Sequence, residues 1–340
     1  MNISPILLKD GYKVGHKFQY PEGTTLVYSN LTPRKSRDGA MDAIVFFGLQ
    51  YFVKEYLMRQ FQEQFFSRPL QEVLAAYKQR MDNYLGKDSI TTDHIAALHT
   101  LGYLPLRIKA LPEGSVVPMK VPVFTICNTR PEFFWLTNML ETLLSAIIWK
   151  PCTSATTAFR YLRTFTRYAQ DTVGNDHSFV PWQGHDFSFR GMGGIEDAVM
   201  SGAAHLLCFT GTDTIPAIDF LEQYYHADAT RELVGGSVPA TEHSVMCMGG
   251  EDDELGTFGR LINEVYPTGI VSIVSDTWDF WQVITEFLPA LKQDILNRNG
   301  KVVIRPDSGD PVKIVVGDPD ATPGSPEYKG AIACMWETFG

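Results

Sequence analysis

The sequence has few of the features that mark membrane-bound, secreted or zinc-stabilised proteins. Its apolar runs are interrupted before they reach the roughly 20 residues that cross a bilayer, and no basic region followed by an apolar core opens the chain as in a signal peptide. The five cysteines are odd in number and form no CxxC pair, which argues against a disulfide framework or a zinc ribbon. We therefore expect a soluble protein of the reducing cytoplasm.

Basic residues are the minority among the charged side chains. The sequence has 39 acidic and 29 basic residues, a formal charge of -10. Nucleic acids and anionic membranes select proteins with a positive surface, so the composition disfavours a general role with either. With 44% hydrophobic residues the chain can still bury a large core. Any phosphate that it binds must meet a local cluster of donors.

The first part of the chain predicts an α+β domain, which we place at residues 1–150. Apolar residues recur at helical spacing over residues 42–66, which predicts a buried helix. Over residues 106–130, short β-type runs are broken by proline and glycine, as in a small antiparallel sheet. A further helix is expected over residues 131–149, because proline is favoured in a first helical turn.

From residue 151 to residue 340 the pattern changes to apolar runs that alternate with helix-length segments. The strand candidates are GHDFSF, HLLCFTG, GGSVPA, IVSIVSD and KVVIRPD, and their alternation with helices predicts parallel βα units. The polar residues that close the strands lie about 30 residues apart, the usual size of one unit; they are Asp186, Asp213, His243, Asp276 and Arg305. In a parallel barrel the loops after the strands share one face. The predicted fold class is therefore α/β, a (β/α) barrel domain with an additional α+β domain.

Two motifs of this second part suit a flat ligand. In HDFSFRG, Phe187 could stack on a ring while Arg190 meets an anion. In GTDT, the Asp213 carboxylate could accept a hydrogen bond from an amide NH2 group and would repel a carboxylate. The structural alternatives are a core phenylalanine, a surface arginine, and an aspartate that caps the next helix.

Three further motifs bring a histidine, acids and an arginine to strand ends. His243 of TEHS can act as a base or a nucleophile once an acid orients its ring. Adjacent strand residues face opposite ways, so Asp276 is a better candidate for that acid than Glu242. Arg305 and Asp307 of IRPDSG suit phosphate, sugar hydroxyls or metal-bound water. A structural histidine and a plain turn are the alternatives.

The chain resembles the nicotinamide phosphoribosyltransferases in the order and spacing of five motifs, HDFSFRG, GTDT, SVPATEHS, SIVSD and IRPDSG. The resemblance extends over nearly the whole chain, because three N-terminal segments also look like that family: LLKDGYKVGHKFQYP, YSNLTPRKS and VFFGLQY. The resemblance implies a pentosyltransferase of NAD biosynthesis that joins nicotinamide to phosphoribosyl pyrophosphate, giving NMN and pyrophosphate. It also implies a homodimer with shared active sites, Mg2+ bound with phosphoribosyl pyrophosphate, and ATP as a coupling co-substrate.

The resemblance implies a role for each residue of the site. Phe187 would stack on nicotinamide opposite the partner subunit's Tyr12, and Asp213 would bind the carboxamide nitrogen. His243 would be phosphorylated by ATP, with Glu242 and Asp276 nearby. Arg190 and Arg305 would lie at the ring and the phosphoribosyl group, and Arg34 would reach phosphate across the dimer. Asp307 would bind ribose hydroxyls or magnesium-linked water, and no residue would be a direct metal ligand. The positions along the tunnel that leads from the ring site are His185, Ser237, Val238, Ser272 and Val303.

Family members continue beyond the point where this sequence stops, with further strands and a glycine-rich phosphate loop, so we expect a C-terminally truncated chain and an incomplete barrel. The nearest alternative is a nicotinate phosphoribosyltransferase, against which Asp213 argues because it would repel an acid. A second is an inactive truncated remnant. A third, a barrel metal hydrolase using His185, Asp186, His243 and Asp307, lacks the usual HxH pair.

Overall fold

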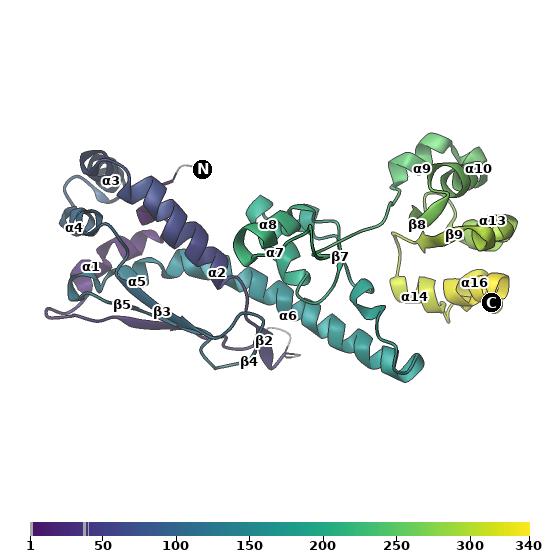
Figure 1. The fold of residues 1–340 in the computed structure, drawn as a ribbon, viewed down its shortest axis with the longest axis horizontal. Helices are drawn as coiled ribbons and strands as arrows, with labels where there is room; N and C mark the ends of the chain where they lie inside the picture. Colours follow the sequence, from purple (N-terminus) through teal and green to yellow (C-terminus); the bar gives the residue numbers. More distant parts are fainter. Residues whose placement is uncertain (1–2, 37–38, 40) are drawn as a thin grey trace. The chain divides into compact units, whose positions relative to one another are not determined.

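The computed structural model describes residues 3–36, 39 and 41–340. It divides into two compact units, Met1–Gly236 (unit 1) and Ser237–Gly340 (unit 2), whose ribbons appear in Figure 1. The sequence predicts a boundary near residue 150, but helix α6 (Glu141–Thr172) passes through that point without a break. Pro151 lies inside this helix, and its ring packs close to the backbone of Gly48. The change of pattern at residue 150 is therefore a change in strand pairing within unit 1.

Antiparallel pairing in unit 1 involves more of the chain than residues 106–130. Strands β1 (Tyr28–Leu31), β5 (Phe124–Asn128) and β3 (Leu106–Ala110) form one sheet in the order β1-β5-β3. A second sheet pairs β2 (Ala43–Val45) with β4 (Val116–Pro118). The single small sheet expected from the sequence is thus two sheets, and each takes one strand from the first 45 residues.

The helix expected over residues 42–66 begins later than predicted. Residues Ala43–Val45 extend as β2, and Gly48, at φ 107°, turns the chain into helix α2 (Leu49–Phe52). A positive φ of this kind is accessible mainly to glycine. The helix continues through η3 (Val53–Gln60) and η4 (Gln62–Phe66), two stretches of π-helix. The prediction was therefore wrong for the first residues and confirmed from Leu49 onward.

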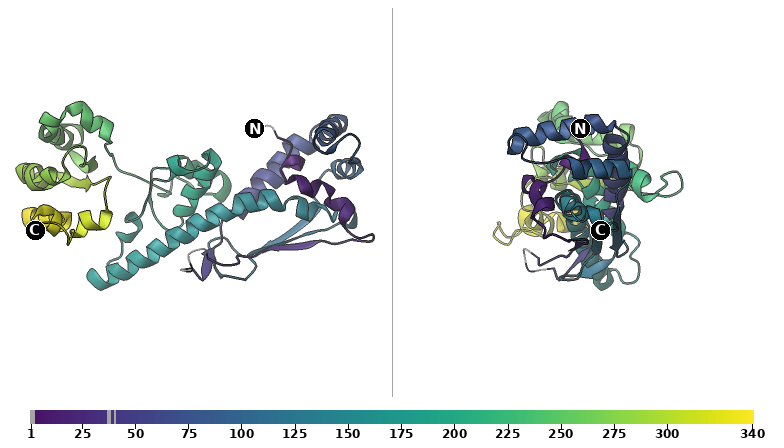
Figure 2. Two further views of the ribbon diagram at one scale, coloured as in Figure 1. Left: turned by 180° about the vertical axis from the view of Figure 1, so that it is seen from behind. Right: turned by 90° about the vertical axis from the view of Figure 1, so that its left-hand side faces the viewer.

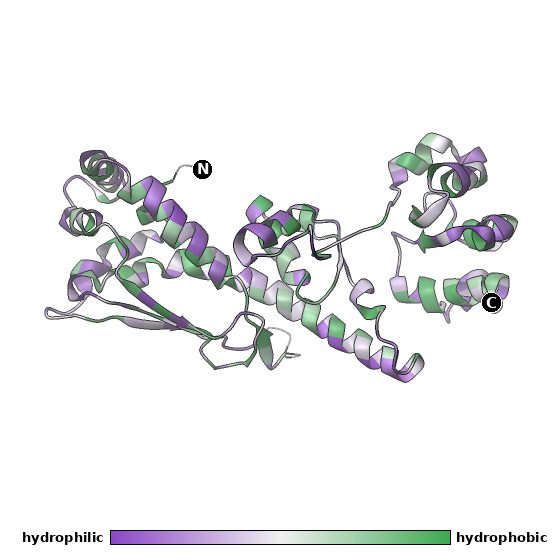
Figure 3. Ribbon diagram, in the orientation of Figure 1, coloured by the Kyte–Doolittle hydropathy of each residue, from purple (hydrophilic) through white to green (hydrophobic). Residues whose placement is uncertain are grey.

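The remaining helices of unit 1 surround two buried apolar clusters. One cluster joins α2 and α6 to helices α7 and α8, and the other joins helices α3, α4 and α5 to β5. Figure 2 shows α6 as the longest helix of this unit, and Figure 3 shows hydrophobic and hydrophilic residues mixed along it. Within the described residues, no helix has the length and apolar character needed to cross a membrane. The helices are η1 (Pro5–Leu7), η2 (Gly11–Gly15), α1 (His16–Gln19), α3 (Leu70–Leu85), α4 (Asp93–Leu101), η5 (Pro131–Phe133), α5 (Leu136–Met139), η6 (Val180–Trp182), η7 (Phe189–Gly191), α7 (Ile195–His205) and α8 (Pro216–Tyr225).

Parallel pairing begins near the end of unit 1 and recurs in unit 2. Strands β6 (His185–Asp186) and β7 (Gly211–Thr212) are parallel, and Gly211 bridges Gly236. In unit 2, β8 (Thr268–Val274) and β9 (Asn299–Arg305) pair in parallel over seven residues, and Ala240 bridges Ser272. The α/β class with small antiparallel sheets is confirmed, although the first three predicted parallel strands shrink to two-residue strands or single bridges.

Helices cover the parallel pair of unit 2. Their buried faces and the inner side of β8 form a third apolar cluster, in which Val271, Ile273 and Val274 are fully buried. The helices are α9 (His243–Gly249), η8 (Glu251–Asp253), α10 (Glu254–Arg260), η9 (Leu261–Val265), α11 (Phe280–Gln282), η10 (Val283–Phe287), α12 (Leu288–Ala290), α13 (Lys292–Asn297), α14 (Pro311–Val316), α15 (Pro326–Lys329) and α16 (Ala331–Phe339).

Gly202 allows α7 and α8 to pack closely. A Cβ atom at this position would lie 2.9 Å from the Ala217 Cβ atom and 3.0 Å from the Thr214 Cβ atom. We expect Gly202→Ala to lower the free energy of unfolding of unit 1 by about 1–3 kcal/mol, the usual cost of overpacking. In the matched control Gly259→Ala, within α10, the nearest atom is the Leu291 Cδ2 atom at 3.8 Å, so that change should be neutral or stabilising. Urea unfolding of both variants measures the difference, and equal responses would contradict the close packing.

Candidate active site

His185, Phe187 and Asp213 form a group at the ends of β6 and β7. Because the two strands are parallel and paired as His185 with Gly211, their C-terminal ends coincide. The His185 Nε2 atom lies 2.7 Å from the Asp213 Oδ1 atom. The His185 and Phe187 ring centroids are 4.6 Å apart, at an interplanar angle of 31°. Phe187 is 57% exposed, so its outer face is available to a flat ligand, with a carboxylate nearby to accept an N–H.

Two of the three structural alternatives for these residues do not hold, and the exception is Arg190, which is a surface arginine. Phe187 is not a core residue, since most of its surface is exposed. Asp213 does not cap α8, because the N-cap of that helix is Ile215 and Pro216 follows in the first turn. Arg190 lies in η7 and is exposed. The exposed ring of Phe187 therefore remains available to a ligand, and the Asp213 carboxylate is held by His185, whose ring lies beside Phe187.

Asp186, which the sequence groups with the other strand-end residues, is a structural residue. Its side chain is buried and accepts hydrogen bonds from the Ser188 amide at 2.9 Å and from the hydroxyls of Thr214 and Thr212 at 2.6 Å and 3.2 Å. Burial alone would raise the pKa of Asp186, but the hydrogen bonds from Ser188 and Thr214 outweigh it and lower the pKa. Asp186 therefore fixes the loops that hold Phe187 and Asp213.

His243 and Asp276 form the centre of a second group, in unit 2. His243 opens α9, and its Nε2 atom lies 3.1 Å from the Asp276 Oδ1 atom. Its Nδ1 atom lies 4.0 Å from the Asp307 Oδ2 atom. The Glu242 carboxylate instead accepts a hydrogen bond from the Ser244 hydroxyl. Of the two acids considered from the sequence, Asp276 is thus the one that contacts the imidazole.

Asp276 also holds the turn that follows β9. Its Oδ2 atom accepts hydrogen bonds from the backbone amides of Asp307 and Ser308, at 3.0 Å and 2.8 Å, and from the Ser308 hydroxyl. Burial opposes ionisation of Asp276, but the bonds from Ser308, the Asp307 amide and His243 outweigh it and lower its pKa. The sequence analysis did not identify Ser308 as a partner of Asp276. The Pro-Asp-Ser-Gly turn is the signal that could have done so, because a tight turn leaves backbone amides free to bind a carboxylate.

Arg305 ends β9 and is held against the segment before His243. Its Nη2 atom donates to the Thr241 carbonyl at 2.6 Å, and its Nε atom lies 4.0 Å from the Asp307 Oδ1 atom. Thr241 is a second residue that the sequence did not single out, and its hydroxyl also accepts a hydrogen bond from the Val274 amide. The guanidinium, the imidazole and two carboxylates therefore meet at one edge of the β8–β9 pair.

The other predicted positions are more dispersed. Tyr12 lies in η2, is 65% exposed and packs edge-on against His16. Arg34 is exposed after β1, and Val303 is 42% exposed in β9. Ser272 is buried, with its backbone bonded to Pro239 and Thr241. Ser237 and Val238 begin unit 2. No group of three metal-ligating side chains occurs in the described parts of the chain.

Comparison with known proteins gives a consistent result. Residues 182–340 match the model of the "Nicotinate phosphoribosyltransferase (NAPRTase) family", and residues 4–108 match the "Nicotinamide phosphoribosyltransferase, N-terminal domain". The sequence is 58% identical to the nicotinamide phosphoribosyltransferase of Acinetobacter baylyi, over 99% of this chain and 68% of that protein. It is 35% identical to the one of Xanthomonas campestris, over 91% of this chain and 63% of that protein.

A solved structure shares the fold. The crystal structure of human nicotinic acid phosphoribosyltransferase superimposes with a TM-score of 0.55 at 16% identity, covering 89% of this chain and 61% of that one. This chain therefore spans about two thirds of the length of the proteins that it resembles.

Proposed function

Because the chain belongs to the nicotinamide phosphoribosyltransferase family, we propose that it takes part in transfer of the phosphoribosyl group of phosphoribosyl pyrophosphate to nicotinamide, giving NMN and pyrophosphate. Kinship with the family supports the reaction class. The choice of nicotinamide depends on one observation, the carboxylate of Asp213 held 2.7 Å from His185 beside the exposed ring of Phe187. A carboxylate accepts hydrogen bonds from a carboxamide NH2 group and repels the carboxylate of nicotinate.

The first group would bind and orient the base. Phe187 would stack on the pyridine ring, the partner subunit's Tyr12 would cover the other face, and Asp213 would fix the carboxamide. Holding the ring in this way sets the pyridine nitrogen in line with the ribose C1 atom, and such positioning is a large part of the rate that an enzyme supplies. Arg190 and the His185 ring would complete the border of this site.

The second group would handle phosphate and ATP. If the His243 Nε2–H group donates its hydrogen bond to the Asp276 carboxylate, the Nδ1 lone pair is left as the nucleophile. We propose that Nδ1 attacks the γ-phosphorus of ATP, forming an N–P bond as the bond to ADP breaks. Glu242, next to His243, would lie at the border of this nucleotide site. Arg305 and Asp307 lie beside the same ring, where they suit the charge of phosphate and the hydroxyls of ribose.

Pyrophosphate departure leaves positive charge on the ribose, so the site needs donors for the leaving phosphates and no covalent sugar intermediate. Magnesium would neutralise part of the pyrophosphate charge, and it would arrive bound to phosphoribosyl pyrophosphate. Ser237, Val238, Ser272 and Val303 would line the approach to the base.

Three further proposals concern the surroundings of the site. The parallel pairs β6–β7 and β8–β9, each with site residues at its C-terminal end, support a (β/α) barrel of the type II phosphoribosyltransferase kind. The exposure of Tyr12 and Arg34 supports a homodimer in which both reach the partner's site. The free cysteines support a cytoplasmic location.

The test is formation of NMN. The purified chain is incubated with nicotinamide, phosphoribosyl pyrophosphate, magnesium and ATP, and NMN is measured by mass spectrometry. We expect His243→Ala to reduce the ATP-stimulated yield by about 10-fold or more, as loss of a nucleophile does. The matched control is His177→Ala, a half-buried histidine whose ring forms a hydrogen bond with the Gly174 carbonyl and has no part in the proposed site, and its yield should not change.

A second arm separates a wrong assignment from an incomplete site. A chimera carries the final third of the Acinetobacter relative after Gly340. If the chimera forms NMN and the chain alone does not, the proposed reaction holds and needs residues beyond those of this chain. If neither protein forms NMN although both fold, the proposed function is wrong.

A further inference from the structure

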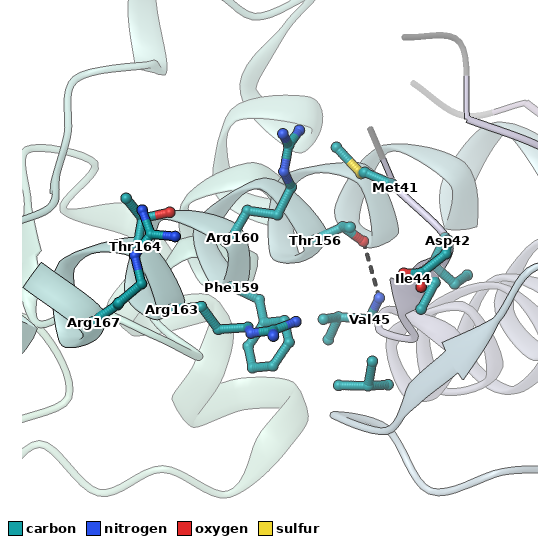
Figure 4. A pocket seen from close by; sticks show the side chains of 12 residues that line it. Met41, Asp42, Ile44, Val45, Thr156, Phe159, Arg160, Arg163, Thr164 and Arg167 are labelled. Carbon is teal, nitrogen blue, oxygen red and sulfur yellow. Dashed lines mark hydrogen bonds between the residues drawn. The ribbon is translucent and has the colours of Figure 1, made fainter. Parts of the chain in front are cut away.

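A pocket of about 330 Å³ lies in unit 1 between β2 and one face of α6. Figure 4 shows its lining, which includes residues 41–45 on one side and the α6 side chains on the other. The Thr156 hydroxyl accepts a hydrogen bond from the Val45 amide at 2.9 Å and so fastens β2 to the helix. None of the residues proposed for phosphoribosyl transfer lines this pocket.

The α6 wall carries three arginines, Arg160, Arg163 and Arg167. Their spacing of three and four residues places them on one face of the helix. At 1.5 Å per residue the first and last are about 10 Å apart along the axis. Three guanidinium groups along such a row match an extended anion better than a single small one.

Two of these arginines have no ion pair among the described residues. Asp42 is the one acid among the described lining residues. Arg163 lies over the ring of Phe159 and Arg167 over the ring of Tyr168, at 6.0 Å and 4.7 Å from the ring centroids. Neither forms an ion pair with another described residue, whereas Arg160 has a further interaction of its own. The inference therefore depends on Arg163 and Arg167.

We propose that this pocket binds an anion with two linked phosphate groups, either free pyrophosphate or the polyphosphate of a nucleotide. Guanidinium groups bind phosphate oxygens in pairs and stay charged at any physiological pH. A volume of about 330 Å³ is at the lower end of the range for small-molecule sites. In a chain with a net charge of -10, two arginines beside a cavity, Arg163 and Arg167, that form no ion pair with a described residue favour an anionic ligand over a solvated surface.

The test measures binding of pyrophosphate by isothermal titration calorimetry, without magnesium and at low salt. We expect the double change Arg163→Gln and Arg167→Gln to weaken one class of pyrophosphate sites by about 10-fold or more, because each removes a charged hydrogen-bonding group. The matched control is Arg231→Gln, an exposed arginine paired with Asp228 on the surface of unit 1, which should bind as the wild type does. Equal stoichiometry and affinity in all three proteins would overturn the proposal.

Two further arms identify the ligand. If the natural ligand is a nucleotide, the double variant should bind ATP more weakly than the wild type does. If the natural ligand is free pyrophosphate, the double variant should lose affinity for pyrophosphate alone. Orthophosphate should bind at least about 10-fold more weakly than either, and equal binding of orthophosphate would overturn the two-phosphate assignment. Because these readouts measure binding at a separate pocket, they do not depend on NMN formation.

Chemical protection tests the same pocket without a variant. Phenylglyoxal modifies accessible arginines, and peptide mass spectrometry gives the extent at each position. Pyrophosphate should slow modification of Arg163 and Arg167 and leave that of Arg231 unchanged. Equal modification of all three with and without pyrophosphate would contradict the proposal.

Discussion

Changing Asp276 to alanine is expected to lower NMN formation about 100-fold, the upper range for loss of a residue that orients a reactive group. The carboxylate has two functions. One oxygen accepts from the His243 imidazole, and the other accepts from the Asp307 and Ser308 amides. Without it the imidazole loses the acceptor that fixes its tautomer, and the turn that carries Asp307 loses its anchor. Transfer of phosphorus-32 from γ-labelled ATP to His243 should fall about 10-fold or more, because the imidazole loses the group that orients it.

The control for this prediction is Asp279→Ala. Asp279 lies three residues further along the chain and caps α11 by accepting hydrogen bonds from the Trp281 and Gln282 amides. Loss of this cap should cost about 1 kcal/mol of stability and leave NMN formation at the wild-type level. If Asp276→Ala and Asp279→Ala retain the same activity and labelling, Asp276 has no role beyond that of a structural acid.

Asp213→Asn should weaken nicotinamide binding about 10- to 100-fold, the range for removing a charged hydrogen-bond partner. The amide that replaces the carboxylate can donate to a ligand carboxylate, so the preference for nicotinamide over nicotinate should narrow by a similar factor. Competition assays with both bases measure the ratio of kcat/KM values for the two substrates. This variant also distinguishes the two bases, nicotinate and nicotinamide, that the names of the matching family models contain.

Asp219→Asn is the matched control for Asp213. Asp219 is exposed in the first turn of α8, so the same chemical change there should leave the ratio for the two bases unchanged. Chemical denaturation of both variants checks that they remain folded. An Asp213→Asn protein that retains the wild-type ratio would show that the carboxylate does not select the substrate.

Much of the second group could be predicted from the sequence because β8 and β9 are in register. Val274 pairs with Arg305, so Asp276 and Asp307 both lie two residues beyond the paired strands and reach the same edge of the sheet. His243 approaches the same edge because the segment before it bridges Ser272. The strand-end argument identifies such residues whenever neighbouring parallel strands end together.

Other features depended on contacts that a local pattern does not contain. Asp186, like Asp276, lies near the C-terminal end of a strand, yet its oxygens accept hydrogen bonds from Ser188, Thr212 and Thr214. No spacing rule separates a buried aspartate of this kind from a ligand-binding one. The arginine row of α6 was also absent from the prediction, because the sequence pattern placed a domain boundary near residue 150, inside the helix that carries the row.

The antiparallel sheets illustrate the same limit. β1 pairs with β5 across nearly 100 residues of sequence, as in the pair Tyr28 with Cys127. The short apolar run of Ala43–Val45 continues into a helical pattern, and only its partner β4 makes it a strand. Such pairings are tertiary effects, since strand propensity depends on the neighbours that a strand packs against.

The pairing of β8 also determines how quickly its amides exchange hydrogen with deuterium in the solvent. β8 has β9 on one side and the bridge at Ala240 on the other, and Val271, Ile273 and Val274 are fully buried. Amides of this kind exchange only when the surrounding unit opens as a whole. His243, in contrast, starts a helix of seven residues. We therefore expect local motion at His243, the proposed nucleophile, and slow exchange in β8, which ends two residues before Asp276.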